Sequence, residues 1–253
     1  MLLVGTVGAV LLGSLERAEA ASYVQRSLLV RDGQFELGLG VGIGHRDAID
    51  ETGLGLNLEL GYGMSSTLEL RFRTGVRFSR SGKVTEADYY ARAHQSETNR
   101  YDGFDTLANP EIGLRFRLTR SGSVELAFDA RAYLPLDDYF GLLGGLPLAL
   151  KLGGRVRLDT GLFVPIVFAD GNTIVDFSIP AHLWILLNSG TYLGPMTGMY
   201  FYDGGGRAVP FGFGLGTSLS YDADVRFWVY FPDVSGDGGA DNFGLGVGLY
   251  VTF

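Results

Sequence analysis

The stretch from Pro110 to Leu134 reads PEIGLRFRLTRSGSVELAFDARAYL, and apolar residues occupy alternate positions in both of its halves. The apolar positions are Ile112, Leu114, Phe116 and Leu118 in the first half, and Val124, Leu126, Phe128, Ala130 and Leu134 in the second. Successive side chains of a strand point to opposite faces, so this period of two predicts two strands, each with one apolar and one charged face. Thr119–Ser123 lies between them and predicts the turn of a hairpin.

The same alternation recurs along most of the chain. Further strands are predicted at residues 34–45, 53–62, 67–79, 146–152, 156–167, 174–187, 192–201, 208–221, 225–231 and 243–253. In the segment 192–201 the pattern does not decide which face is which. With 110–118 and 124–134 the prediction is about twelve strands, an even number as expected for a single-chain membrane barrel. The predicted fold is all-β, an antiparallel up-and-down transmembrane β-barrel over residues 34–253.

The predicted connections alternate between short and long. The short ones are 63–66, 119–123, 153–155, 188–191 and 222–224, and the long ones are 45–52, 79–109, 135–145, 168–173, 202–207 and 232–242. In barrels of this type the periplasmic turns are short and the extracellular loops are long. Both termini are therefore expected on the periplasmic side.

Charged residues gather on one face of the predicted strands, which suggests that this face lines the lumen. The predicted lumen-lining residues are Glu59, Glu69, Arg71, Arg73, Arg77, Glu111, Arg115, Arg117, Glu125, Asp129, Arg131 and His182. A soluble barrel of this size would enclose a cavity too wide for its apolar side chains to fill, whereas lipid solvates the apolar face of a membrane barrel. A soluble β-sandwich is the alternative, but the strand lengths match the roughly 9–11 residues that cross a bilayer.

If the turn after Leu118 centres on Ser121, and the turn after Gly63 centres on Ser65, unlike charges lie opposite each other on neighbouring strands. The expected pairs are Arg117 with Glu125, Glu111 with Arg131, and Glu59 with Arg71. Directly opposed residues of unlike charge stabilise a sheet. Such pairs either serve only the structure or also set the polarity of a pore.

Residues 1–15 form an apolar stretch, and Ala18-Glu19-Ala20 follows it and fits the small-x-small rule for signal-peptide cleavage. Residues 1–20 are therefore predicted to be a signal peptide, with a buried strand as the alternative. Residues 21–33 follow as a periplasmic N-terminal segment or plug.

The inward faces of the first and last strands are nearly bare and should meet where the barrel closes. They carry Gly38, Gly40, Gly42 and Gly44 on one strand, and Gly244, Gly246 and Gly248 on the other. Large voids are rare inside proteins, so the segment from Tyr23 to Val30 is expected to fill the space beside these glycines. A mobile tail is the alternative.

Composition narrows the function. The 253 residues carry a formal net charge of −8, which argues against nucleic acid as a partner, and they include no cysteine for thiolate metal sites. The loop Asp233–Asp241 lacks the terminal Glu of a calcium loop and suits an ordinary turn, so neither a metal nor a cofactor is expected. The long connection 79–109 is expected to fold into the mouth of the barrel or to contact a surface partner.

The C-terminus reads GVGLYVTF from Gly246 to Phe253. It resembles the C-terminal assembly signal of bacterial outer-membrane β-barrel proteins: Gly248, Val251 and Phe253 match the pattern, while Gly246 stands where a polar residue is expected. The resemblance implies recognition by the outer-membrane assembly machinery, and location in the outer membrane among its lipid and lipopolysaccharide.

The function expected from these features is a small pore or transport channel for small polar solutes. A structural or surface-interaction barrel with a blocked lumen is the first alternative. The second is a rim hydrolase that uses His45, which is followed by Asp47, Asp50 and Glu51. Solvated charges at a rim explain that cluster more simply, so no catalytic residue is assigned.

Overall fold

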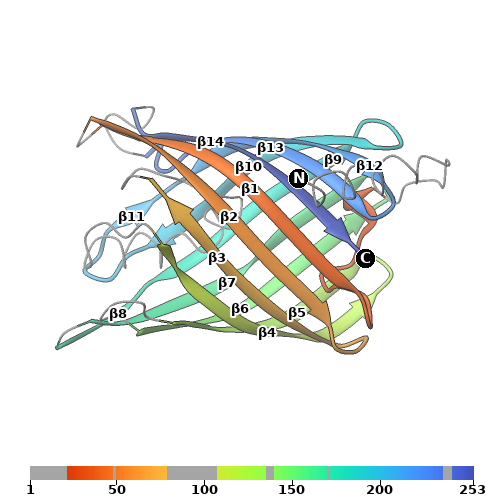
Figure 1. Cartoon of the computed structure of the whole chain (residues 1–253), viewed down its shortest axis with the longest axis horizontal. Coiled ribbons are helices and arrows are strands. Elements are labelled where there is room, and N and C mark those ends of the chain that lie inside the picture. The colour runs from red at the N-terminus through yellow and green to blue at the C-terminus, as the bar shows by residue number, and fades with distance from the viewer. Residues whose placement is uncertain (1–21, 48–49, 79–106, 135–139, 170, 236–240) are drawn as a thin grey trace, which may run out of the picture.

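The computed structural model describes residues 22–47, 50–78, 107–134, 140–169, 171–235 and 241–253, and these form one barrel (Figure 1). Its strands are β1 Phe35–Arg46, β2 Glu51–Gly63, β3 Leu68–Arg77, β4 Leu107–Ser121, β5 Val124–Tyr133, β6 Phe140–Leu152, β7 Val156–Ala169, β8 Asn172–Val175, β9 Phe177–Leu186, β10 Thr191–Phe201, β11 Arg207–Ala208, β12 Phe211–Ser220, β13 Ala223–Phe231 and β14 Phe243–Thr252. Only Asp176 separates β8 from β9, and only Val209 and Pro210 separate β11 from β12. β8 with β9, and β11 with β12, therefore each act as one interrupted strand, and the wall of the barrel consists of twelve strands.

The barrel closes where β1 pairs with β14, and all pairings between the strands are antiparallel. Closure satisfies the backbone hydrogen bonds that an open sheet edge would leave unmade, which is a requirement inside lipid. The predicted up-and-down barrel of about twelve strands is confirmed. Among the described residues, no helix is both long and apolar enough to cross a membrane.

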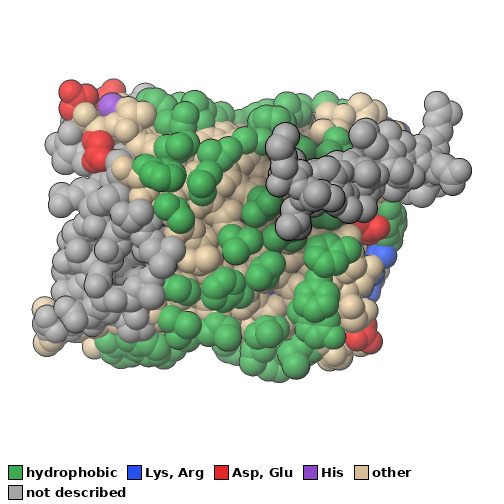
Figure 2. Space-filling view, in the orientation of Figure 1, with side chains coloured by type: hydrophobic (Ala, Val, Ile, Leu, Met, Phe, Trp, Pro, Cys, Tyr) green, Lys and Arg blue, Asp and Glu red, His purple; other side chains and the backbone are tan. Residues whose placement is uncertain are grey.

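The two faces of the wall differ as the alternation predicts. Apolar side chains such as Leu39, Leu56 and Phe116 are at least 40 % exposed on the outside. Figure 2 shows apolar side chains covering the side of the barrel, with charged side chains gathered at its two ends. The inner face buries Glu69 and Asp129, which are at most 1 % exposed. A barrel with an apolar outside and a charged inside is built to be solvated by lipid.

Two strands begin three or more residues earlier than the sequence predicts. β6 starts at Phe140 rather than at residue 146, and β4 starts at Leu107 rather than at residue 110. In β6 the consecutive Leu142-Leu143 and Gly144-Gly145 break the alternation, yet the pairing with β7 is continuous from Phe140↔Phe168 to Leu152↔Val156. Backbone pairing with the long strand β7 therefore extends β6 into a region where the side-chain pattern does not predict a strand.

The three predicted cross-strand charge pairs are wrong in register. Arg117 lies opposite Ala127, Arg131 opposite Gly113, and Arg71 opposite Gly61. The β4–β5 hairpin has a tight two-residue turn, and an irregularity between Arg117 and Thr119 shifts the ladder. A shift of two residues keeps every side chain on its face but changes its partner.

Candidate functional site

The candidate site is the interior of the barrel, which has two chemically different halves. One half, over β3 to β7, carries most of the buried Arg, Glu and Asp side chains. The other, over β9 to β14, carries the large buried side chains Trp184, Tyr192, Met196, Tyr200, Trp228 and Tyr230. In β10 the residues Tyr192, Met196 and Tyr200 face inward, which settles the face that the sequence left open.

Ion pairs link the charged half into a network. Asp129 on β5 accepts hydrogen bonds from Arg115 and Arg131, each at 2.7 Å. Arg131 also approaches Glu111 at 3.5 Å, and Glu111 pairs with Arg73. Arg131 and Glu111 are thus partners along a diagonal although they are not opposed in the ladder.

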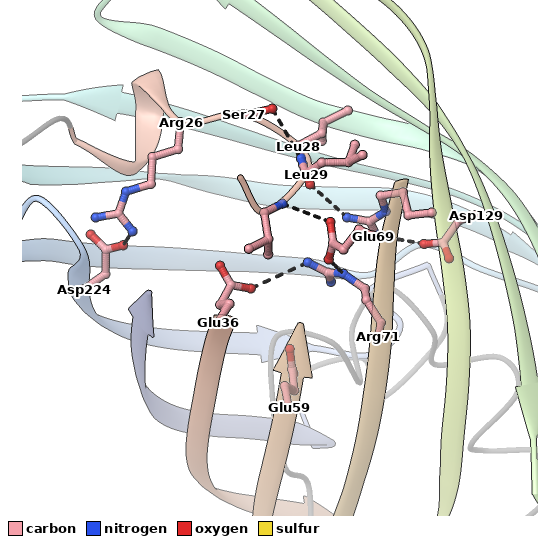
Figure 3. A network of polar contacts seen from close by, with 12 residues as sticks. Arg26, Ser27, Leu28, Leu29, Glu36, Glu59, Glu69, Arg71, Asp129 and Asp224 are labelled. Carbon is pink, nitrogen blue, oxygen red and sulfur yellow. Dashed lines mark hydrogen bonds and ion pairs between the residues drawn. The ribbon is translucent and has the colours of Figure 1, made fainter. Parts of the chain in front are cut away.

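A second network lies nearer the end that holds the C-terminus (Figure 3). Glu69 on β3 pairs with Arg71, and Arg71 lies 3.6 Å from Glu36 on β1. On β5 and β6, Glu125 accepts a hydrogen bond from Lys151 at 2.7 Å. On β7, Arg157 donates to Asp159 at 2.7 Å. Each of the buried charges in these two networks therefore has an opposite charge within the wall, which offsets the cost of removing it from water.

The remaining predicted lumen residues also lie on the inner face. Glu59 accepts a hydrogen bond from Asn57 at 3.0 Å, and Arg77 is 5 % exposed near the far end of β3. Arg117 donates to Ser27 at 2.7 Å. His182 is fully buried, and its ring centroid lies 3.6 Å from that of Trp184.

The N-terminal segment, defined here as residues 22–32, lies inside this end of the barrel. It begins with the 3₁₀-helix η1 (Tyr23–Gln25), which the hydroxyl of Ser22 caps by accepting from the Val24 N–H at 3.4 Å. Val24 is 1 % exposed and packs with Trp184 and Tyr192. Beyond η1 the chain passes across the charged half and reaches β1.

A cavity of about 200 Å³ remains between the N-terminal segment and the charged half of the wall. Its lining includes Glu59, Arg73, Glu111 and Arg131, together with Tyr23 from the segment. A second cavity of about 410 Å³ lies at the mouth, beside Arg26 to Asp32. The space inside the barrel is therefore polar, and the N-terminal segment divides it.

The glycines of the first and last strands meet as predicted. Gly40 lies opposite Gly248, Gly42 opposite Gly246, and Gly44 opposite Gly244.

The prediction that residues 23–30 fill the space beside these glycines is wrong. A Cβ on Gly246 would lie 2.5 Å from the Trp228 ring, and one on Gly244 would lie 2.5 Å from the Tyr230 ring. Aromatic rings of β13, together with the Tyr250 ring of β14, cover Gly244, Gly246 and Gly248. The N-terminal segment packs instead over β2, where the Val30 side chain would meet a Cβ on Gly61 at 3.1 Å.

His45 does not join the acidic residues that follow it. Its Nδ1 lies 2.9 Å from the Thr52 hydroxyl, and its ring stacks on Phe243. Within the described ranges no ion pair joins His45 to Asp47, Asp50 or Glu51. Nor do these ranges contain a group of three or more His, Asp or Glu residues that could hold a metal ion.

Other sequence predictions fall partly or wholly outside the described residues. These are the signal peptide at 1–20, most of the connection 79–109, and positions 236–240 of the loop Asp233–Asp241. At the C-terminus, Phe253 and Phe35 exchange backbone hydrogen bonds of 2.8 and 2.9 Å. The Phe253 side chain is 66 % exposed.

No protein-family model and no curated protein matches the sequence. Several solved structures match the fold. The KdgM porin in complex with disordered oligogalacturonate has a TM-score of 0.60 at 6 % identity, covering 86 % of this chain and 99 % of that one. The NanC porin has a TM-score of 0.58 at 9 % identity, covering 84 % of this chain and 98 % of that one.

A third solved structure, the COG4313 outer membrane channel from Pseudomonas putida F1, has a TM-score of 0.56 at 11 % identity. It covers 90 % of this chain and 98 % of that one. At sequence identities this low, the similarity establishes the fold of this chain but does not identify a solute. The chain is a closed twelve-stranded antiparallel β-barrel with the fold of bacterial outer-membrane porins and channels.

Proposed function

We propose that this protein is a channel of the bacterial outer membrane that admits small polar solutes, and that its N-terminal segment restricts the passage. One observation carries the proposal: the charged inner face borders a cavity of about 200 Å³ instead of packing into a dry core. Buried charges that face open space keep water and polar solutes in a path where an apolar lining would exclude them. The apolar outer belt supplies the contact with lipid.

The charges that line this path carry both signs. Arg73, Arg115 and Arg131 face Glu111 and Asp129 across distances that allow direct pairing. Paired charges leave only a weak net field along the lumen, so a solute is selected by hydrogen bonding and size more than by its charge. The twelve lumen residues of the sequence prediction are proposed as the lining of this path.

The orientation and assembly of the barrel complete the proposal. The short connections, such as Ser121 to Val124 and Leu152 to Val156, lie at the end that holds the C-terminus, and we place this end in the periplasm. Residues 1–20 are proposed as the export signal. Gly248, Val251 and Phe253 are proposed as the contact with the assembly machinery, and lipid and lipopolysaccharide as the surroundings of the outer face.

Liposome swelling tests the channel directly. Vesicles that contain the chain without residues 22–32 should swell in isosmotic solutions of small polar solutes such as glycine or arabinose. The full chain should give slower swelling, because the N-terminal segment occupies one end of the lumen. Protein-free vesicles and larger sugars serve as controls, and no swelling with either protein would contradict the proposal.

A structural barrel with a blocked lumen is the second candidate. The observation that favours it is the dense bonding of the N-terminal segment to the wall, described below. The truncated chain separates the two candidates, because a structural barrel needs no continuous path and would stay closed to solutes after the segment is removed.

A further inference from the structure

The wall of the barrel binds the main chain of the N-terminal segment through charged side chains. Glu125 accepts the Leu28 N–H at 2.9 Å, and Glu69 accepts the Val30 N–H at 3.0 Å. Arg115 donates to the Leu28 carbonyl at 3.1 Å. The wall thus supplies both an acceptor and a donor to Leu28, and an acceptor to Val30, from β3, β4 and β5. Figure 3 shows this part of the segment beside Glu69.

The start of the segment is held in the same way. Arg157 donates to the carbonyls of Tyr23 and Arg26, at 3.0 and 2.9 Å. Lys151 donates to the Gln25 carbonyl at 3.3 Å. In total six main-chain groups of the segment bond to ionisable side chains of the wall.

The charged groups that bind the main chain are each oriented by a partner within the wall. The partners are Arg71 for Glu69, Asp129 for Arg115, Lys151 for Glu125, and Asp159 for Arg157. Because each pair lies entirely in the wall, the binding groups keep their positions when the segment leaves. Sites that are organised before binding hold their ligands more tightly, since less ordering is required on binding.

Two side-chain pockets add selectivity. The Tyr23 ring lies 3.8 Å from the Arg226 guanidinium and packs edge-on against Trp184, and its hydroxyl donates to Asp159 at 3.0 Å. Arg26 pairs with Asp224, which is fully buried, and donates to the Tyr221 carbonyl at 2.8 Å. One pocket therefore suits an aromatic side chain, and the other suits a basic one three residues further on.

We propose that the lumen is a binding site for oligopeptides, and that the N-terminal segment occupies it as an intramolecular ligand. Main-chain N–H and C=O groups are common to all peptides, so a wall that forms hydrogen bonds with them recognises peptides as a class of ligand. A plug held only by its side chains would not need these contacts. This proposal rests on the proposed channel function, because it names oligopeptides as the solutes that enter the channel and reach this site.

Peptide binding in trans tests the proposal. A labelled peptide with the sequence of residues 22–31 is titrated into the detergent-solubilised barrel that lacks residues 22–32, and its fluorescence anisotropy is followed. We expect saturable binding, and much weaker binding to the full chain, whose site is filled. N-methylation of the Leu28 or Val30 nitrogen should weaken binding by about tenfold, as expected for one lost hydrogen bond to a charged group.

The matched control is N-methylation at Leu29, whose N–H bonds to Ser27 within the segment at 3.3 Å and not to the wall. Its affinity should exceed that of the other two methylated peptides. Equal affinity for all three would show that the wall does not bind the main chain, and absence of binding to the folded truncated barrel would overturn the proposal. If the truncated chain does not fold, the full chain with Arg26→Glu replaces it, and it should bind the peptide more tightly than the unaltered chain does.

Current through planar bilayers separates this proposal from the channel function. The truncated barrel alone should conduct, and the peptide added on the side of the C-terminus should block that current reversibly. Conduction that the peptide does not block would leave the channel intact and overturn the peptide site. Peptide binding without any conduction would contradict the channel alone.

Discussion

A charged side chain has a very different free energy on the two faces of this wall. Leu114 is the central residue of β4 and is 37 % exposed on the outer face, whereas its neighbour Arg115 is 8 % exposed and pairs with Asp129. A charged side chain on the outer face would contact lipid, whereas one on the inner face contacts the network of ion pairs.

The exchange Leu114→Arg should lower the stability of the folded barrel by about 2–4 kcal/mol, the range for a basic residue near the bilayer midplane. Leu114→Met is the matched control and should cost less than about 1.5 kcal/mol, because it conserves volume and polarity. Equilibrium unfolding in lipid vesicles measures both changes. Equal stabilities for the two variants would mean that this face does not contact lipid.

Single glycines matter where another side chain uses the space of their missing Cβ. Gly246→Val should destabilise the barrel by about 1–3 kcal/mol, because overpacking forces neighbours from their preferred positions. The displaced neighbour is Trp228, whose ring would lie 2.5 Å from the new Cβ. Gly144→Ala is the control, since nothing lies within 4 Å of its Cβ position. A neutral Gly246→Val would mean that the ring does not cover the seam.

Sequence periodicity predicted the face of a residue more reliably than its partner. Arg71 and Arg117 both lie inside as expected, but their opposed residues are Gly61 and Ala127 rather than the predicted carboxylates. Alternation defines a face in steps of two, whereas a partner depends on turn length and on bulges, which leave little trace in the pattern.

At the scale of elements, the N-terminal segment differs from the strands because its placement depends on side-chain bonding. Its apolar residues do not alternate, so periodicity gave no position for it. The residues that hold it come from β3, β4, β5, β6, β7 and β13, far apart in the sequence. Only the closed barrel brings them together, which explains why the sequence suggested a plug but not its contacts.

A charge exchange tests the docking of this element. Arg26→Asp alone should expose the segment to trypsin or chymotrypsin in the folded protein, because it places two carboxylates side by side at Asp224. The double variant Arg26→Asp with Asp224→Arg restores opposite charges and should recover much of the protection. Limited proteolysis followed by mass spectrometry reads out both. Equal cleavage of the unaltered chain and of Arg26→Asp would show that the pair does not hold the segment.

The aromatic half of the interior was the least predictable part of the site. In β10, large side chains lie on both faces: Tyr192 and Tyr200 point inward, and Met199 and Phe201 point outward. Hydrophobicity alone cannot distinguish these faces, because aromatic side chains suit both lipid contact and packing inside the barrel. The bare glycines were the available signal, since they marked the space that the rings of β13 fill.

At the scale of the whole molecule, the wall and the N-terminal segment are separable. β1 begins at Phe35 and closes against β14 without any residue of the segment, so the barrel does not need the segment for its sheet. The segment is held by hydrogen bonds, by ion pairs and by the packing of Val24 against Trp184 and Tyr192. The central claim is therefore that the barrel is a channel which its own N-terminal segment restricts.

Single-channel recording in planar bilayers tests this claim most directly, with the full chain and the chain without residues 22–32 compared in the same lipid and salt. The truncated chain should show steady conductance larger than that of the full chain, because removing the segment joins the inner cavity to the mouth. Heat modifiability on gels confirms that both proteins are folded. Equal conductance, or closed barrels in both cases, would contradict the account.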